Sequence, residues 1–293
     1  MDFFKIIDQL SEVDADVLDR FDSRRAVFSS LGTAAKRSAL AATPLFLGAL
    51  FQKAYAGTTA TAVEVLQYAL ALELFEQDFY AKVKASAPYA GASTADKAAV
   101  DQIKKHEDSH VTLLRGAISG LGGTPVTGVT FKAAVFAGLT TFKTGAAATS
   151  QLGIAQLLED TGVRAYKGRA GELLGTDLLT VALQIHSVEA RHAAKIRDMR
   201  GQRAWVNPAD DLATHPVYTS GVTPGSTPGA FGLVVPAYTT ASPREDNTTQ
   251  SGVDIKAGLG ATYSAADAAA AFDEFLQVAE VLDNSRAGGL IGA

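Results

Sequence analysis

Four long stretches of the chain place apolar residues at alternating steps of three and four, which is the spacing of one face of a helix. They run over about residues 59–86, 94–120, 150–174 and 178–199, the last after an expected N-cap at Thr176. Segments rich in glycine, proline and threonine separate them. Because helices with one apolar face bury it against one another, we predict an all-α fold built on a four-helix bundle.

Each apolar stripe is interrupted near its middle by polar side chains. The first and third stretches carry a glutamate followed seven residues later by a tyrosine, and the second and fourth carry a Glu-x-x-His step. These residues are Glu73 and Tyr80, Glu107 and His110, Glu159 and Tyr166, and Glu189 and His192. The same chemistry therefore occurs twice, as in two halves related by an approximate twofold axis.

Residues in the middle of four bundled helices meet in one layer. Four carboxylates buried there without counterions would repel one another and lose their hydration, at a cost of roughly several kcal/mol per group. Two divalent cations would cancel that charge. Residues three apart share a helix face, so a Glu-x-x-His step can give one ion both a carboxylate and an imidazole. The chain has no cysteine, so any metal must bind oxygen and nitrogen ligands.

We therefore predict a di-metal centre in the bundle. Its ligands are Glu73, Glu107, His110, Glu159, Glu189 and His192. The alternative is a bundle in which these side chains form a metal-free, hydrogen-bonded polar core.

Several nearby residues are candidates for supporting roles. Tyr80 and Tyr166 are expected to hydrogen-bond to a carboxylate that surrounds the ligands, with buried core aromatics as the alternative. His186 is a candidate for a similar role. Glu76 is expected at the surface, and the other possibility is that it serves as an alternative ligand; His106 lies off the apolar stripe.

The remaining segments suggest three parts, over residues 1–56, 57–200 and 201–293. The link from Leu121 to about Thr149 is too long for a tight turn, and its length fits a crossover between helices two and three. After residue 201 the chain is rich in Pro, Gly, Thr and Ser, with a short β-like stretch over 233–238 and an amphipathic helix over about 264–282. We expect this extension to wrap over the bundle and dock by its terminal helix.

The first 56 residues have the order of a secretion signal. Arg24 and Arg25 precede an apolar run over 39–51 and then Ala54-Tyr55-Ala56, which suggests the twin-arginine type and a periplasmic protein. The run is shorter than the about 20 apolar residues that span a bilayer. The alternative is a retained helical arm that packs on the bundle of a cytoplasmic protein.

The glutamate and histidine pattern lies in short segments that resemble a known family. The segments are LELFEQDFY, HEDSHV with the following LGGTP, LLEDTGVRAY, VEARHAAKIR, REDNTTQSGVD and AFDEFL. They resemble ferritin-like di-iron carboxylate proteins, and the tyrosines resemble those of bacterioferritins and rubrerythrins. Over about residues 57–290 the chain is similar to the bacterial ferritin-like domain family that includes desiccation-related proteins.

The resemblance implies a role for each ligand. It implies that Glu107 and Glu189 bridge two iron ions, with manganese as the alternative metal. It also implies that Glu73 and Glu159 are terminal ligands and that His110 and His192 each cap one ion.

Two functional hypotheses follow. The first is a di-iron oxidoreductase that oxidises ferrous iron or a small substrate with oxygen or peroxide. The second is a non-enzymatic, exported stress or surface protein with a structural metal centre and the C-terminal extension as its interaction surface. The net charge of −5 offers no broad cationic surface for nucleic acid. The bundle faces and the extension are the candidate surfaces for a homo-oligomer.

Overall fold

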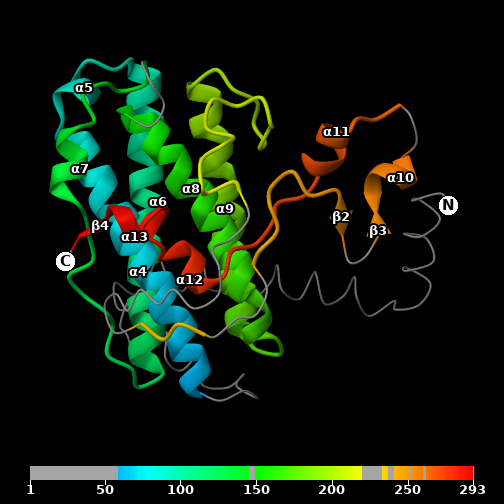
Figure 1. Cartoon of the computed structure of the whole chain (residues 1–293). Helices are drawn as coiled ribbons and strands as arrows, with labels where there is room; N and C mark the ends of the chain where they lie inside the picture. The colour runs from blue at the N-terminus through cyan, green and yellow to red at the C-terminus, as the bar shows by residue number, and fades with distance from the viewer. Residues whose placement is uncertain are drawn as a thin grey trace, which may run out of the picture. The chain divides into compact units, whose positions relative to one another are not determined.

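The computed structural model describes residues 59–144, 149–219, 233–236, 241–250, 253–259 and 262–292. Its core is a bundle of four long helices, α4 (Thr59–Lys84), α6 (Thr94–Gly120), α8 (Gln151–Ala170) and α9 (Asp177–Met199) (Figure 1). The predicted all-α bundle is therefore confirmed. The signal-like segment over residues 1–56 lies outside the described residues, and residues 233–236 of the β-like stretch form no strand.

Local sequence signals set the helix ends. Ser93 accepts a hydrogen bond from the Asp96 N–H group at 3.1 Å at the start of α6, and Ser150 accepts one from Gly153 at 3.0 Å at the start of α8. The short helix α5 (Ala87–Ala90) separates α4 from α6, and the 3-10 helix η2 (Gly171–Leu173) separates α8 from α9. Thr176 is the N-cap residue of α9, as predicted, but its hydroxyl donates to the Leu173 carbonyl at 2.7 Å and makes no cap hydrogen bond to the helix.

The bundle consists of two helical hairpins joined by a long crossover. α4 packs mainly on α6, and α8 packs mainly on α9. The connection between α6 and α8 contains strand β1 (Thr130–Phe131) and helix α7 (Ala133–Ala137). It runs along the bundle, so that α6 and α8 point in the same direction, as the length of the link predicted (Figure 1).

Aromatic residues of the crossover cover the side of α4 that faces away from the other long helices. The Phe131 ring stacks on Phe75 at a centroid distance of 5.3 Å and lies 5.0 Å from Phe79. Phe136 packs edge-on against Phe79 at 6.1 Å. The middle of α4 is consequently buried on all its faces, because these aromatic rings cover the side that α6 and α8 leave free.

The predicted single terminal helix over 264–282 is wrong in extent. The structure has two short helices there, α11 (Ala265–Ala269) and α12 (Val278–Val281). Between them, the Leu276 N–H group donates to the Arg164 carbonyl of α8 at 3.1 Å. The Leu276 carbonyl oxygen lies against Gly168, at the point where any other residue would carry its Cβ atom. The chain leaves the helical conformation because its backbone lies directly against α8, and the Gln277–Glu280 capping box then starts α12.

The last described residues return to the crossover. Helix α13 (Ala287–Leu290) leads into strand β4 (Ile291–Gly292), which pairs antiparallel with β1. Earlier in the extension, strands β2 (Thr249–Gln250) and β3 (Val253–Asp254) form an antiparallel pair followed by helix α10 (Ile255–Leu259). None of the helices in the described part of the chain has the length and apolarity needed to cross a membrane.

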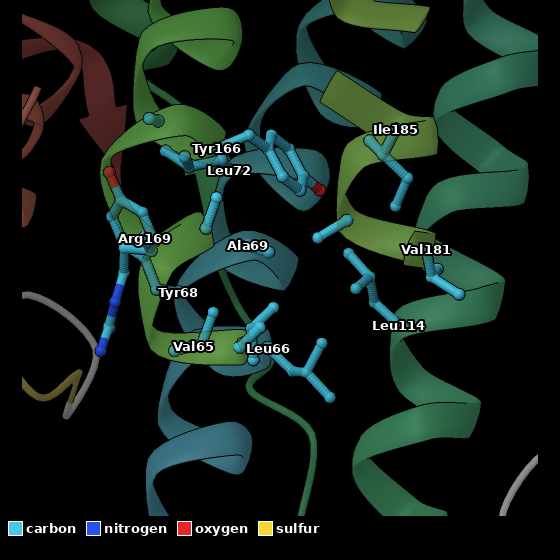
Figure 2. Close-up of a pocket in the computed structure, with 14 residues that line it drawn as sticks. Val65, Leu66, Tyr68, Ala69, Leu72, Leu114, Tyr166, Arg169, Val181 and Ile185 are labelled. Atoms are coloured by element: carbon cyan, nitrogen blue, oxygen red, sulfur yellow. The ribbon is translucent and has the colours of Figure 1, made fainter. Parts of the chain in front are cut away.

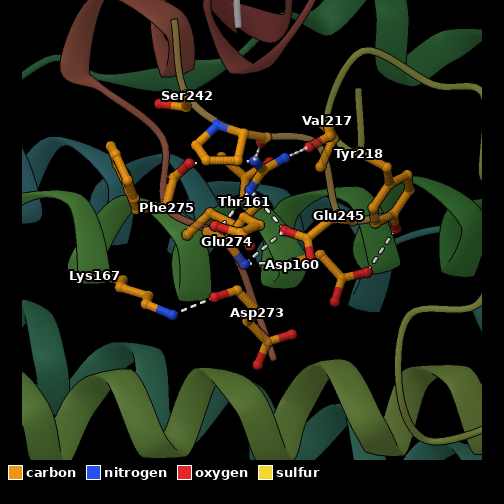
Figure 3. Close-up of polar contacts among 12 residues, drawn as sticks. Asp160, Thr161, Lys167, Val217, Tyr218, Ser242, Glu245, Asp273, Glu274 and Phe275 are labelled. Carbon is orange, nitrogen blue, oxygen red and sulfur yellow. Dashed lines mark hydrogen bonds and ion pairs between the residues drawn. The ribbon is translucent and has the colours of Figure 1, made fainter. Parts of the chain in front are cut away.

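A buried arginine of α8 holds the extension on the bundle. Arg164 is 2% exposed, and its Nε atom lies 2.8 Å from the Glu245 carboxylate. The guanidinium also donates to four backbone carbonyl groups of the extension (Figure 3). These belong to Val217, Pro243, Glu274 and Phe275, the last three at 2.8, 3.1 and 3.2 Å. One side chain therefore connects three separate segments of the extension to the bundle.

A second buried arginine joins α9 to the start of the extension. Arg197 makes ion pairs of 2.5 Å with Asp160 of α8 and with Asp210. The Tyr218 hydroxyl donates to the same Asp160 carboxylate at 2.5 Å. The segment after α9 is thereby fixed against both helices of the second hairpin.

Candidate metal centre

The bundle brings all six predicted ligands into one buried layer. The four glutamates are 0% exposed, and the two histidines are 9% and 4% exposed. Within the described residues they form two overlapping groups that could each hold a metal ion. One comprises Glu73, Glu107, His110 and Glu189, and the other comprises Glu107, Glu159, Glu189 and His192. In each group, one ligand atom from every residue lies within 4.8 Å of the others.

The first group converges on His110 of α6. Its Nδ1 atom lies 3.1 Å from Glu73 Oε2, 3.3 Å from Glu107 Oε2 and 3.3 Å from Glu189 Oε1. Three long helices, α4, α6 and α9, therefore contribute to it.

The second group converges on His192 of α9. Its Nδ1 atom lies 3.0 Å from Glu107 Oε1, 3.1 Å from Glu159 Oε2 and 3.8 Å from Glu189 Oε2. Glu107 and Glu189 thus each direct one oxygen to each histidine. This is the arrangement of carboxylates that bridge two ions.

Three of the shared oxygens have no hydrogen-bond partner among the described residues. They are Glu107 Oε1 and both carboxylate oxygens of Glu189. Because buried polar atoms are normally hydrogen-bonded, these oxygens are available to a cation. A set of carboxylates and imidazoles suits iron or manganese, so the residues present fit a di-metal site.

In the absence of metal ions, bound protons reduce the negative charge of the buried cluster, and the pKa values of His110, Glu107 and Glu189 are raised accordingly. Burial lowers the pKa of His110, but the hydrogen bonds to Glu107 and Glu73 outweigh it and raise the value to about 11. Burial and the neighbouring Glu73 charge raise the pKa of Glu107 to about 7. Burial and the charges of Glu107 and Glu73 raise that of Glu189 well above its ordinary value.

Metal binding is therefore expected to release protons and to strengthen as the pH rises from 6 to 8. Glu107 has a folded pKa of about 7, above its ordinary 4.5, so its contribution to the stability of the ion-free protein is fully present below pH 4.5 and is lost as the pH rises through about 7. The same deprotonation frees the carboxylate for a cation. Calorimetric titration with Mn²⁺ in buffers of different ionisation enthalpy measures the released protons. A proton count of zero at pH 6 would contradict this prediction.

Two tyrosines fix the unshared glutamates. The Tyr166 hydroxyl donates to Glu73 Oε1, and the Tyr80 hydroxyl donates to Glu159 Oε1. Each bond joins one hairpin to the other and leaves the second carboxylate oxygen facing a histidine. The third candidate, His186, makes no hydrogen bond or ion pair with the six ligands in the described part of the chain, and its Nδ1 atom has no partner.

Sequence reasoning missed the contact of His106. Its Nδ1 atom lies 2.8 Å from Nε2 of His192, the two rings are stacked at 5.1 Å, and Gln102 reaches its other ring nitrogen at 2.7 Å. The Nδ1 atom of His192 faces the carboxylates, so His106 orients this imidazole through its far nitrogen. Only the packing of α6 on α9 reveals this contact, because His106 lies off the apolar stripe of its own helix.

Replacing His106 with alanine is expected to weaken binding of the ion at the His192 group by about tenfold, because a ligand imidazole loses the partner that orients it. The ion at the His110 group should bind as before. Anaerobic titration with Mn²⁺ resolves the two affinities. Equal weakening at both positions would show that the substitution acts on the whole bundle.

The expected surface position of Glu76 is wrong. This residue is 3% exposed, because it lies three residues after Glu73 on the same face of α4 and its carboxyl group packs beside Gly162 of α8 and Glu189. Burial and the charges of Glu189 and Glu159 raise its pKa well above the ordinary value. A fifth carboxyl group therefore lies close to the six ligands.

A small apolar cavity lies between α4, α8 and α9, beside the centre (Figure 2). Val65, Leu72, Ile185 and the Tyr166 ring are among the residues that line it, and its volume is about 20 Å³. That volume admits one molecule of the size of water or dioxygen. Tyr166 thus has the cavity on one side and the Glu73 carboxylate on the other.

Comparison with known proteins gives one finding. Residues 61–202 match the family model of the ferritin-like domain. The matched span contains all six ligands and nearly all of the four long helices. No curated protein matches the chain.

Proposed function

Because residues 61–202 belong to the ferritin-like domain family, we propose that this protein binds two iron ions and oxidises ferrous iron or a small substrate with oxygen or peroxide. The observation that carries the proposal is the pair of buried groups that share Glu107 and Glu189. The four carboxylates balance the charge of two divalent ions, and each imidazole completes one group.

Two bound iron ions would supply electrons as they pass from the ferrous to the ferric state. The residues prepare the site for this change. Carboxylate oxygens suit a hard ferric ion. Tyr80 and Tyr166 hold the unshared glutamates in place, whereas the oxygens of Glu189 accept no hydrogen bond and are free to change their mode of contact.

The apolar cavity beside Tyr166 supports a small oxidant. Its volume of about 20 Å³ admits a molecule of the size of water or dioxygen. Its lining suits an apolar gas such as dioxygen.

Iron oxidation can be tested with the purified full chain. Iron and manganese are quantified per chain, ferrous iron is added without oxygen, and air is then admitted while the near-ultraviolet absorbance of carboxylate-bound ferric iron is followed. Two bound ions and a rapid rise in absorbance would support the proposal. Two tightly bound ions with no response to air would support the structural role instead, and a chain that binds no metal would refute both.

A further inference from the structure

Glu76 is a buried carboxyl group without a partner. It follows Glu73 by one helical turn on α4 and is 3% exposed. Among the described residues, no group donates a hydrogen bond to it and no cationic side chain lies within ion-pair distance. Burial of such a group is unfavourable unless something compensates for it.

A glycine on the facing helix leaves room for this side chain. A Cβ atom built on Gly162 of α8 would lie 3.6 Å from Glu76 Oε1, 3.3 Å from Glu189 Oε2 and 3.4 Å from Glu189 Cγ. Both carboxylates therefore approach the same point of α8, where a Cβ atom would be in ordinary contact with Glu76 and in tight contact with Glu189. Glu189 Oε2 is the oxygen that faces His192.

The two halves of the bundle differ at this position. Gly162 follows Glu159 by three residues, just as Glu76 follows Glu73. The first hairpin thus adds a carboxyl group where the second has only a hydrogen atom. The extra carboxyl group lies at the point of α8 that the His192-facing oxygen of Glu189 also approaches, so the two groups have unequal surroundings.

We propose that Glu76 is a seventh protein ligand, which reaches the ion held by Glu107, Glu159, Glu189 and His192. This inference rests on the proposed di-metal function. Four carboxylates balance two divalent ions, so a fifth leaves one negative charge in excess. That charge favours binding of a cation at the His192 group and favours the trivalent state of that ion over the divalent state.

Calorimetric titration of the full chain with Mn²⁺, in the absence of oxygen, tests the proposal on Glu76→Gln and on the control Glu64→Gln. Both variants remove a carboxylate from α4, but Glu64 lies outside the two groups. The wild type and Glu64→Gln should bind two ions. Glu76→Gln should bind one ion with unchanged affinity and the other about tenfold or more weakly.

The results separate the two proposals. Glu76→Gln binding both ions as tightly as the wild type would overturn the ligand role while leaving the di-metal function intact, whereas a wild type that binds no ion would end the proposed function itself. Thermal unfolding without metal reports whether Glu76→Gln folds. If it does not, Glu76→Asp decides, because the shorter side chain keeps the charge but withdraws the carboxylate and should weaken the same ion only. Unchanged binding in that variant would count against the proposal.

Discussion

Glu107→Gln is expected to weaken both ions together, each by more than about 100-fold, and to abolish the absorbance response to air. The reason is geometric, because Glu107 Oε2 lies 3.3 Å from His110 and Glu107 Oε1 lies 3.0 Å from His192. Loss of a group that merely orients a metal ligand costs about 10–100-fold in affinity, and loss of a shared ligand should cost more. Bound iron per chain and the absorbance change measure the two effects.

Glu73→Gln is the matched comparison for this variant. Glu73 belongs to one group only, so its loss should weaken the ion at His110 more than the ion at His192. The ion-free Glu107→Gln protein should remain folded, because burial already favours the uncharged form of Glu107. If Glu107→Gln retained two ions at wild-type affinity, the carboxylate would not bridge them.

Arg164→Met is expected to lower the free energy of unfolding by about 3–5 kcal/mol, the range for removal of one partner from a buried ion pair. The substitution leaves Glu245 without its guanidinium and removes the donor of four backbone carbonyl groups. The extension should then detach from α8. Urea denaturation measures the loss of stability, and limited proteolysis reports cleavage after residue 201.

Arg244→Met provides the control for Arg164. Arg244 is paired with Asp246 at 2.9 Å, but both side chains are about half exposed, and surface ion pairs contribute roughly 0–1 kcal/mol. This variant should resemble the wild type in both measurements. If Arg164→Met also had wild-type stability and wild-type resistance to proteolysis, the contacts of Leu276 and α12 would be sufficient to hold the extension on the bundle.

The helices and ligands could be predicted from the sequence because they depend on spacing within one helix. A glutamate in the middle of an apolar stripe must face the core wherever that stripe is buried. The positions of Glu73 and Glu159 follow from this rule, and so do those of the two Glu-x-x-His steps. The length of the link between α6 and α8 likewise predicted the crossover.

The features that the sequence did not predict depend on contacts between distant segments. Glu76 shares the face of Glu73, but only the packing of α4 against α8 and α9 shows that its carboxyl group is buried beside Gly162 and Glu189. His106 meets His192 only because α6 packs on α9. The predicted terminal helix is interrupted because Leu276 bonds to α8, a contact that periodicity alone does not reveal.

Neither hairpin contains a complete centre. The hairpin of α4 and α6 supplies three of the four residues in the group around His110, and the other hairpin supplies Glu189. The hairpin of α8 and α9 supplies three of the four residues in the group around His192, and the first hairpin supplies Glu107. The ions would therefore act as cross-links between the two halves of the chain. An affinity measured for the metal would include the free energy of holding those halves together. Removal of the metal by a chelator should therefore weaken the contact between the two hairpins before it affects the structure of either hairpin alone.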